Sequence, residues 1–228
     1  MGDVTIGVDT LFFVGPFAIS TSLGTSLLLT AVVSLAAWLM VRRMGGKPTR
    51  RQAVTEAIVS GLEDAVRQVA GVHAERIMPF ISTLWVFLIC GNLLGLVPGM
   101  DSPTRDLSVT AALAVTVFLS VHWFGITTQG WGNYFRHYLS PNPIMLPFHI
   151  ISEITRTVAL AVRLFGNMMS LELAAFLVLM VAGFLVPIPI LMLHIVEALV
   201  QAYIFGMLAL IYVVGGIQSH EERSNSSR

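Results

Sequence analysis

Long runs of apolar residues, separated by short polar segments, dominate this chain of 228 residues. Several runs lack charge over about 20 residues, the length that an α-helix needs to cross roughly 30 Å of hydrocarbon. The pattern therefore predicts an all-α membrane protein, a single integral membrane domain (1–228) with about five membrane-embedded helices. The predicted segments are an outer N-terminal segment (1–21), a first span (22–41), an amphipathic interfacial helix (52–76), a hairpin of two spans (77–100 and 107–128) and two long helices (144–186 and 190–218).

Residues 52–76 have a different pattern from the spans, because charged and apolar residues alternate there with the period of a helix. The apolar residues recur at steps of four, four, four and three, which places them on one helical face. We expect an amphipathic helix on the cytoplasmic interface of the membrane. Its apolar face consists of Val54, Ile58, Leu62, Val66 and Val69.

The last two predicted helices are longer than a perpendicular crossing requires. A helix over residues 144–186 would extend roughly 65 Å, about twice the thickness of the hydrocarbon, so it must tilt steeply or break. The sequence Pro187-Ile188-Pro189 predicts a turn before the final helix. The predicted topology therefore has an outer N-terminus, five crossings and a cytoplasmic C-terminus.

The charges support this topology. Residues 42–51 carry five positive charges, and by the positive-inside rule this loop is cytoplasmic. Ten of the 13 Lys and Arg residues fall in predicted cytoplasmic segments, and only Arg105 falls outside. A first helix that is retained, without a transit peptide, favours a bacterial inner membrane.

Composition excludes several classes of protein. Only 11% of the residues are charged, against about 25% in soluble domains, which excludes an ordinary soluble domain. The net charge is zero, so the sequence does not indicate nucleic acid as a partner. The single cysteine, Cys90, lies in an apolar run and predicts neither a disulfide framework nor a thiolate metal site. No glycine-rich nucleotide loop occurs, so we expect no cofactor, no metal and no catalytic site of its own.

The candidate chemistry lies in the last two helices, where charges are costly and therefore suggest function. Arg163 has no acidic residue three or four positions away, and Glu172 lies on the opposite helical face, roughly 13 Å along the axis. These two residues therefore cannot form a local salt bridge. The face of Arg163 forms a mostly polar stripe: Arg156, Leu160, Arg163, Asn167 and Ser170.

The final helix carries His194, Glu197 and Gln201 on one face. A histidine and a carboxylate one turn apart can pass a proton, because imidazole titrates near neutral pH. The alternative is that these side chains hold helices together, at about 1 kcal/mol each. For Gln201 alone the two interpretations are equal, whereas Glu172, His194 and Glu197 together favour a path for protons or cations.

Several motifs resemble one family closely. The segment Arg163-Leu164-Phe165-Gly166-Asn167-Met168 and the segment Gln201-Ala202-Tyr203-Ile204-Phe205 resemble subunit a of the rotary F-type ATP synthase. The segments 91–98 and 106–110 resemble the end of the second span and the start of the third span of that family. The resemblance runs over nearly the whole chain.

The resemblance implies two aqueous half-channels, and a ring of c subunits that rotates past the long tilted helices. It assigns Arg163 the role of the essential arginine, which faces the c-ring carboxylate and blocks direct passage of protons between the half-channels. The implied partners are the c-subunit ring, the b subunits of the peripheral stalk and membrane lipid. The ion pathway that we expect consists of Glu172, His194, Glu197, Gln201, Asn167, Asp106, His149 and Glu153.

The chain departs from the family pattern near the inner half-channel. His149 stands where the family usually has an acidic residue, and Glu153 lies one turn further on. Proton coupling is favoured, and sodium coupling remains open because the surrounding residues resemble a divergent branch of the family.

Two other classes of protein are alternatives to this family. The first is a secondary transporter that binds an ion or an anionic solute at Arg163 and Glu172, but such proteins usually show inverted repeats, and none is found in this sequence. The second is a structural scaffold, which would not need an unpaired arginine within a helix.

Overall fold

The computed structural model consists almost entirely of long helices, and it describes residues 10–14, 17–42, 50–96, 102–130, 146–182 and 187–218. Within these residues, five helices are long and apolar enough to cross a membrane, which confirms the predicted all-α fold. A short antiparallel hairpin precedes them. In chain order the elements are β1 (Thr10–Val14), β2 (Phe17–Ser20), α1 (Thr21–Arg42), α2 (Arg50–Ala70), the 3-10 helix η1 (Gly71–His73), α3 (Ala74–Leu94), the 3-10 helix η2 (Pro103–Arg105), α4 (Leu107–Gln129), α6 (Leu146–Ala182) and α7 (Pro187–Gln218).

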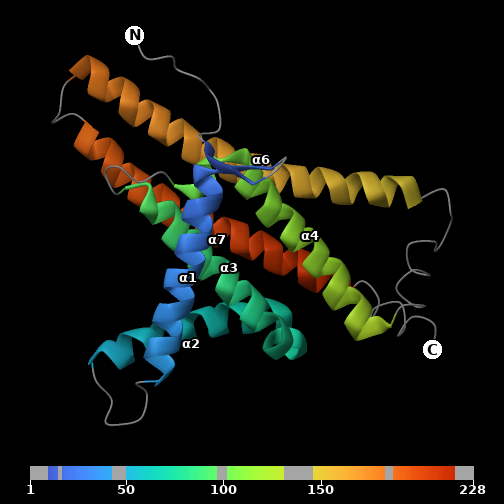
Figure 1. Ribbon diagram of the computed structural model, residues 1–228. Coiled ribbons are helices and arrows are strands. Elements are labelled where there is room, and N and C mark those ends of the chain that lie inside the picture. Colours follow the sequence, from blue (N-terminus) through green and yellow to red (C-terminus); the bar gives the residue numbers. More distant parts are fainter. Residues whose placement is uncertain are drawn as a thin grey trace.

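Helix α7 lies at the centre of the molecule and packs against α2, α3, α4 and α6 (Figure 1). Helix α6 runs across the bundle, and α2 lies across the end of α1. The apolar core forms where α3, α4, α6 and α7 meet, and burial of large side chains such as Trp85, Leu88, Leu164 and Phe205 stabilises it. In contrast, Leu29 is the only buried side chain of α1 among those that the structure describes.

Helix α2 is amphipathic, with Val66 and Ala70 buried against the core and Glu56 exposed. It ends at Ala70, earlier than the predicted residue 76, and α3 begins at Ala74 rather than at residue 77. The reason is Gly71, whose φ of 52° interrupts the α-helix at a position that only glycine adopts without strain. A 3-10 turn over Gly71–His73 then joins the two helices.

Helix α3 ends at Leu94, before the predicted stop at Pro98-Gly99, which lies outside the described residues. The chain reverses closely here, since a Cβ on Gly95 would lie 2.9 Å from the Cβ of Ser102. Helix α4 then starts with Asp106 as its N-cap, whose Oδ1 accepts a hydrogen bond of 2.8 Å from the Ser108 N–H group.

The start of α7 corrects one prediction. The two prolines do not form a turn before the helix: α7 begins at Pro187 and contains both in its first turn, where a missing N–H group breaks no helical hydrogen bond. Helix α6 covers 146–182 of the predicted 144–186. The greater part of the basic loop (43–49), the connection 131–145 and the C-terminal residues 219–228 lie outside the described residues.

Candidate functional site

A hydrogen bond between a half-buried amide and a buried amide joins the two long helices. Asn167 Nδ2 on α6 donates to Gln201 Oε1 on α7 over 2.7 Å. Gln201 is 1% exposed, and its Nε2 atom is buried without a hydrogen-bond partner among the described residues. The Asn167–Gln201 pair is thus a polar bridge within an otherwise apolar interface.

A second contact between the same helices defines how they align. The guanidinium of Arg156 lies 4.6 Å from the centre of the Tyr212 ring, a cation–π contact. Arg156 lies 11 residues before Asn167, and Tyr212 lies 11 residues after Gln201. The two contacts are therefore separated by the same number of residues on each helix, in opposite chain directions, as expected for antiparallel helices. A residue on α6 can thus be matched to the residue on α7 at the same height along the helix axes.

Arg163 lies one turn before Asn167, at the edge of the packed face of α6. Its neighbours Leu160 and Leu164 are buried, whereas Arg163 itself is exposed. Among the described residues, no acidic side chain lies within ion-pair distance of it; Glu63 and Arg67 on α2 form the one ion pair found there. A charge in an apolar helix is costly without a partner, which makes Arg163 a candidate functional residue.

The acidic residues and the histidine lie on the other side of the amide bridge. Glu172 is five residues beyond Asn167, and the register puts it level with residue 196, next to Glu197. His194, which is 5% exposed, lies two residues before residue 196 on α7. The structure therefore brings Glu172, His194 and Glu197 to similar levels, about 6–10 Å along the helices from the bridge, and separates them from Arg163.

His149 and Glu153 do not join this group. They lie one turn apart near the start of α6, about 27 and 21 Å along the axis from Asn167. His149 is exposed and Glu153 is half-buried. Asp106 is the N-cap of α4, where its Oδ1 accepts a hydrogen bond from the Ser108 N–H group.

Sequence reasoning missed a network of buried hydroxyls and amides beside Glu197. Asn92 on α3 is fully buried, and its Nδ2 donates to the Ala198 carbonyl over 3.1 Å. Thr104 Oγ1 donates to Asn92 Oδ1 over 2.8 Å and lies 2.7 Å from Ser102 Oγ, which donates to the carbonyl of residue 91. The signal in the sequence was Asn92, a lone asparagine in an apolar run. The network attaches the segment before α4 to α7 between the histidine and the glutamine.

The second missed feature is the contact between Trp85 on α3 and the backbone of α7. Trp85 Nε1 donates to the Tyr203 carbonyl over 3.4 Å, and the two rings are parallel with centres 6.2 Å apart. Gly206 makes this approach possible, because a Cβ there would overlap the Trp85 indole. The signal in the sequence was a glycine within an apolar helix.

Comparison with known proteins shows the family to which the chain belongs. The family model of the ATP synthase A chain matches residues 23–214. The chain is 52% identical over 225 residues to ATP synthase subunit a of Legionella pneumophila, covering 98% of each chain. It is 58% identical over 217 residues to ATP synthase subunit a 1 of Hahella chejuensis, covering 94% of this chain and 92% of the relative. With ATP synthase subunit a 2 of Pelobacter propionicus the identity is 58% over 213 residues, covering 93% of each. This integral membrane protein therefore belongs to the ATP synthase A chain family.

Proposed function

We propose that the protein is the stator subunit a of an F-type ATP synthase, and that α6 and α7 carry ions to and from the carboxylates of a c-subunit ring. Ion flow would then drive rotation, and with it ATP synthesis or hydrolysis. The observation that carries the proposal is the separation of Arg163 from Glu172, His194 and Glu197 by the Asn167–Gln201 bridge. Membership of the ATP synthase A chain family supports it.

The exposed face of α6 suits contact with a rotor. Its side chains are large and apolar, and apolar contacts are non-directional, so a ring can slide past without breaking hydrogen bonds. Arg163 lies at the border of this face. The apolar residues that are at least half exposed on α6 are Phe148, Ile151, Ile154, Val158, Val162, Leu173, Phe176, Leu177, Met180 and Val181.

In this proposal Arg163 attracts each ring carboxylate as it arrives in its ionised form. Two unit charges 4 Å apart attract by about 4 kcal/mol at an effective dielectric constant of about 20, which keeps the carboxylate ionised while it passes. A proton cannot cross directly from one half-channel to the other, because the guanidinium never gives up its own proton. Lysine would be a poor substitute, since a desolvated ammonium can become neutral.

Two routes serve the ring in this scheme. Glu172, His194 and Glu197 form the outer half-channel, and His149 and Glu153 lie on the inner one. A histidine in the outer route favours protons as the coupling ion, because imidazole exchanges a proton near neutral pH. The N-terminus is outside and the C-terminus cytoplasmic, in a bacterial inner membrane, with the b subunits as further partners.

Disulfide cross-linking in the purified complex tests the rotor contact. Val162 is 53% exposed on α6, next to Arg163, and Leu119 on α4 is 59% exposed and serves as the control. In a Cys90→Ala background, Val162→Cys should form a disulfide with a cysteine placed beside the ring carboxylate, and Leu119→Cys should not. Equal yields at the two positions would argue against the proposal. A chain that purifies without c subunits and binds a solute by itself would support a secondary transporter.

A further inference from the structure

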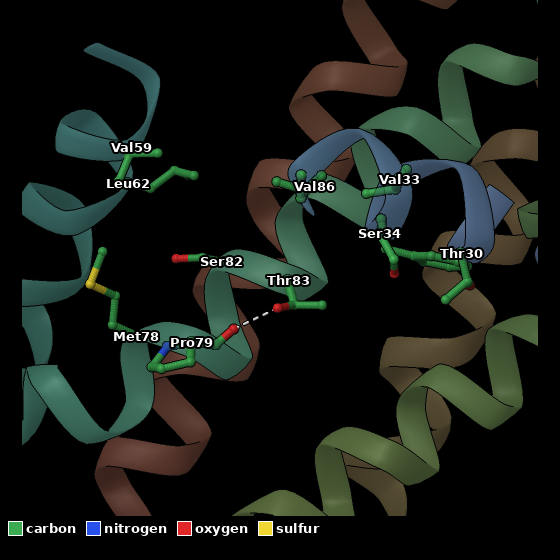
Figure 2. Close-up of a pocket in the computed structure, with 12 residues that line it drawn as sticks. Thr30, Val33, Ser34, Val59, Leu62, Met78, Pro79, Ser82, Thr83 and Val86 are labelled. Atoms are coloured by element: carbon green, nitrogen blue, oxygen red, sulfur yellow. Dashed lines mark hydrogen bonds between the residues drawn. The ribbon is translucent and has the colours of Figure 1, made fainter. Parts of the chain in front are cut away.

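A pocket of about 400 Å³ lies between α1, α2 and α3, apart from the residues of α6 and α7 discussed above (Figure 2). Its volume is in the range of small-molecule sites, about 300–1,000 Å³. The walls are almost entirely apolar, with Val33 from α1, Leu62 from α2 and Met78 from α3 facing the same space. Close-packed interiors do not retain gaps of this size without an occupant or a partner surface.

The hydroxyl groups around the pocket restrict what can fill it. Thr83 Oγ1 donates to the Pro79 carbonyl over 2.7 Å, and Thr30 Oγ1 donates to the Ser26 carbonyl over 2.8 Å, so both are satisfied within their own helices. Ser82 Oγ is buried without a hydrogen-bond partner among the described residues, and Figure 2 shows it directed into the gap between α3 and α2. Because the Ser82 oxygen is buried, an occupant of the pocket cannot reach it, and the occupant should be apolar.

Residues of α1 indicate how deep in the membrane the pocket lies. Thr30 and Ala37 line it, and these residues are about 10 Å apart along the helix. Immediately beyond Ala37, the guanidinium of Arg42 lies 3.8 Å from the centre of the Trp38 ring. Tryptophan and arginine at the end of a span mark the level of the lipid head groups. The pocket thus extends from just below the head groups into the hydrocarbon.

We propose that this pocket binds one acyl chain of a membrane phospholipid. At about 30 Å³ for each water-sized group, the pocket holds about a dozen methylene groups, which is most of one chain. A protein helix fits less well, since one turn with its side chains occupies roughly 500 Å³. The bound chain fills the space that α1 leaves beside α2, since Leu29 is the one buried residue among the α1 side chains that the structure describes. This inference does not depend on the proposed ion coupling.

Photolabelling of the whole complex tests the lipid site. The complex is placed in vesicles of phosphatidylethanolamine and phosphatidylglycerol that carry a diazirine in the middle of one acyl chain. Ala37→Phe fills the pocket, and Ala36→Phe changes the adjacent exposed residue, which does not line it. We expect labelling of Met78 and Val86 to fall at least fivefold in Ala37→Phe and to stay unchanged in Ala36→Phe.

A second variant, Ser82→Leu, fills the pocket from α3 and should lower the labelling in the same way if Ala37→Phe fails to assemble. Labelling of Met78 that remains at the wild-type level in the pocket-filling variant would overturn the proposal. So would labelling of Met78 no stronger than that of the lipid-exposed Leu119, or a photoreactive residue at position 59 that cross-links to another subunit instead of to lipid.

Discussion

Single buried polar residues determine how the central helices meet. Gln201 and Asn92 each offer an amide within an apolar interior, and each is held by a partner on another helix. Removing the Asn167 amide would leave Gln201 Oε1 unsatisfied, at a cost of about 1–3 kcal/mol. These contacts therefore fix the rotation of α7 about its axis and its position along that axis. The positions of His194 and Glu197 follow from them.

Gly206 should be intolerant of any side chain. Gly206→Ala would force a methyl group into the Trp85 indole, and overpacking of this kind costs about 1–3 kcal/mol. Gly215→Ala on the same helix is the control, because a Cβ there meets nothing within 4 Å. Unfolding of the purified protein in a titration with dodecyl sulfate, followed by tryptophan fluorescence, should begin at lower detergent fraction in Gly206→Ala only. Equal unfolding midpoints for both variants would contradict the packing described here.

At the scale of elements, α6 and α7 present two groups of ionisable residues at different levels. Glu172, His194 and Glu197 lie on one side of the amide bridge, and Arg163 lies on the other. His149 and Glu153 lie near the start of α6, about 27 and 21 Å along the axis from Asn167. Under the proposed function, this separation along α6 keeps the two ion routes apart.

The outer route can be tested without disturbing the bundle. Glu172→Gln and His194→Ala should each slow ATP-driven pumping strongly, because the ionisable group that relays the ion is lost. Assembly with the ring should persist. Glu56→Gln on the exposed face of α2 removes a carboxylate elsewhere and should pump normally. Fluorescence quenching in inverted vesicles measures the rate, and normal pumping by the Glu172→Gln, His194→Ala double variant would rule this route out.

The positions of the spans were predictable because hydropathy reports transfer into hydrocarbon, which depends on sequence locally. The ends of elements were less predictable. Gly71 ends α2 through a positive φ, and Pro187 is the first residue of α7 instead of part of a turn before it. Both outcomes depend on which of several allowed backbone conformations the residue adopts. The hairpin of β1 and β2 was not predicted, although Gly15-Pro16 between two apolar runs is a turn signal.

The contacts within the candidate site could not be predicted from helical periodicity. Asn167 and Gln201 were each identified as polar positions, but their pairing depends on the rotation of two helices about their axes. The same holds for Arg156 with Tyr212. A periodic pattern states which residues share a face and does not state which face meets which.

The whole molecule has two sides with different surroundings. Helix α7 is packed on four helices, whereas α6 exposes a broad apolar face. We assign the α6 side to the rotor and the pocket between α1, α2 and α3 to lipid. Arg163 belongs to the first side and is the residue on which the proposed coupling depends.

Passive ion flux in membranes stripped of the ATP-hydrolysing sector tests this coupling most directly, measured together with ATP synthesis by the intact complex. Arg163→Ala should abolish synthesis and increase passive flux, because the routes remain and only the barrier between them is lost. Adding Glu172→Gln should return the flux to the wild-type level by closing the outer route. ATP synthesis at a near wild-type rate in Arg163→Ala would contradict the role of this arginine.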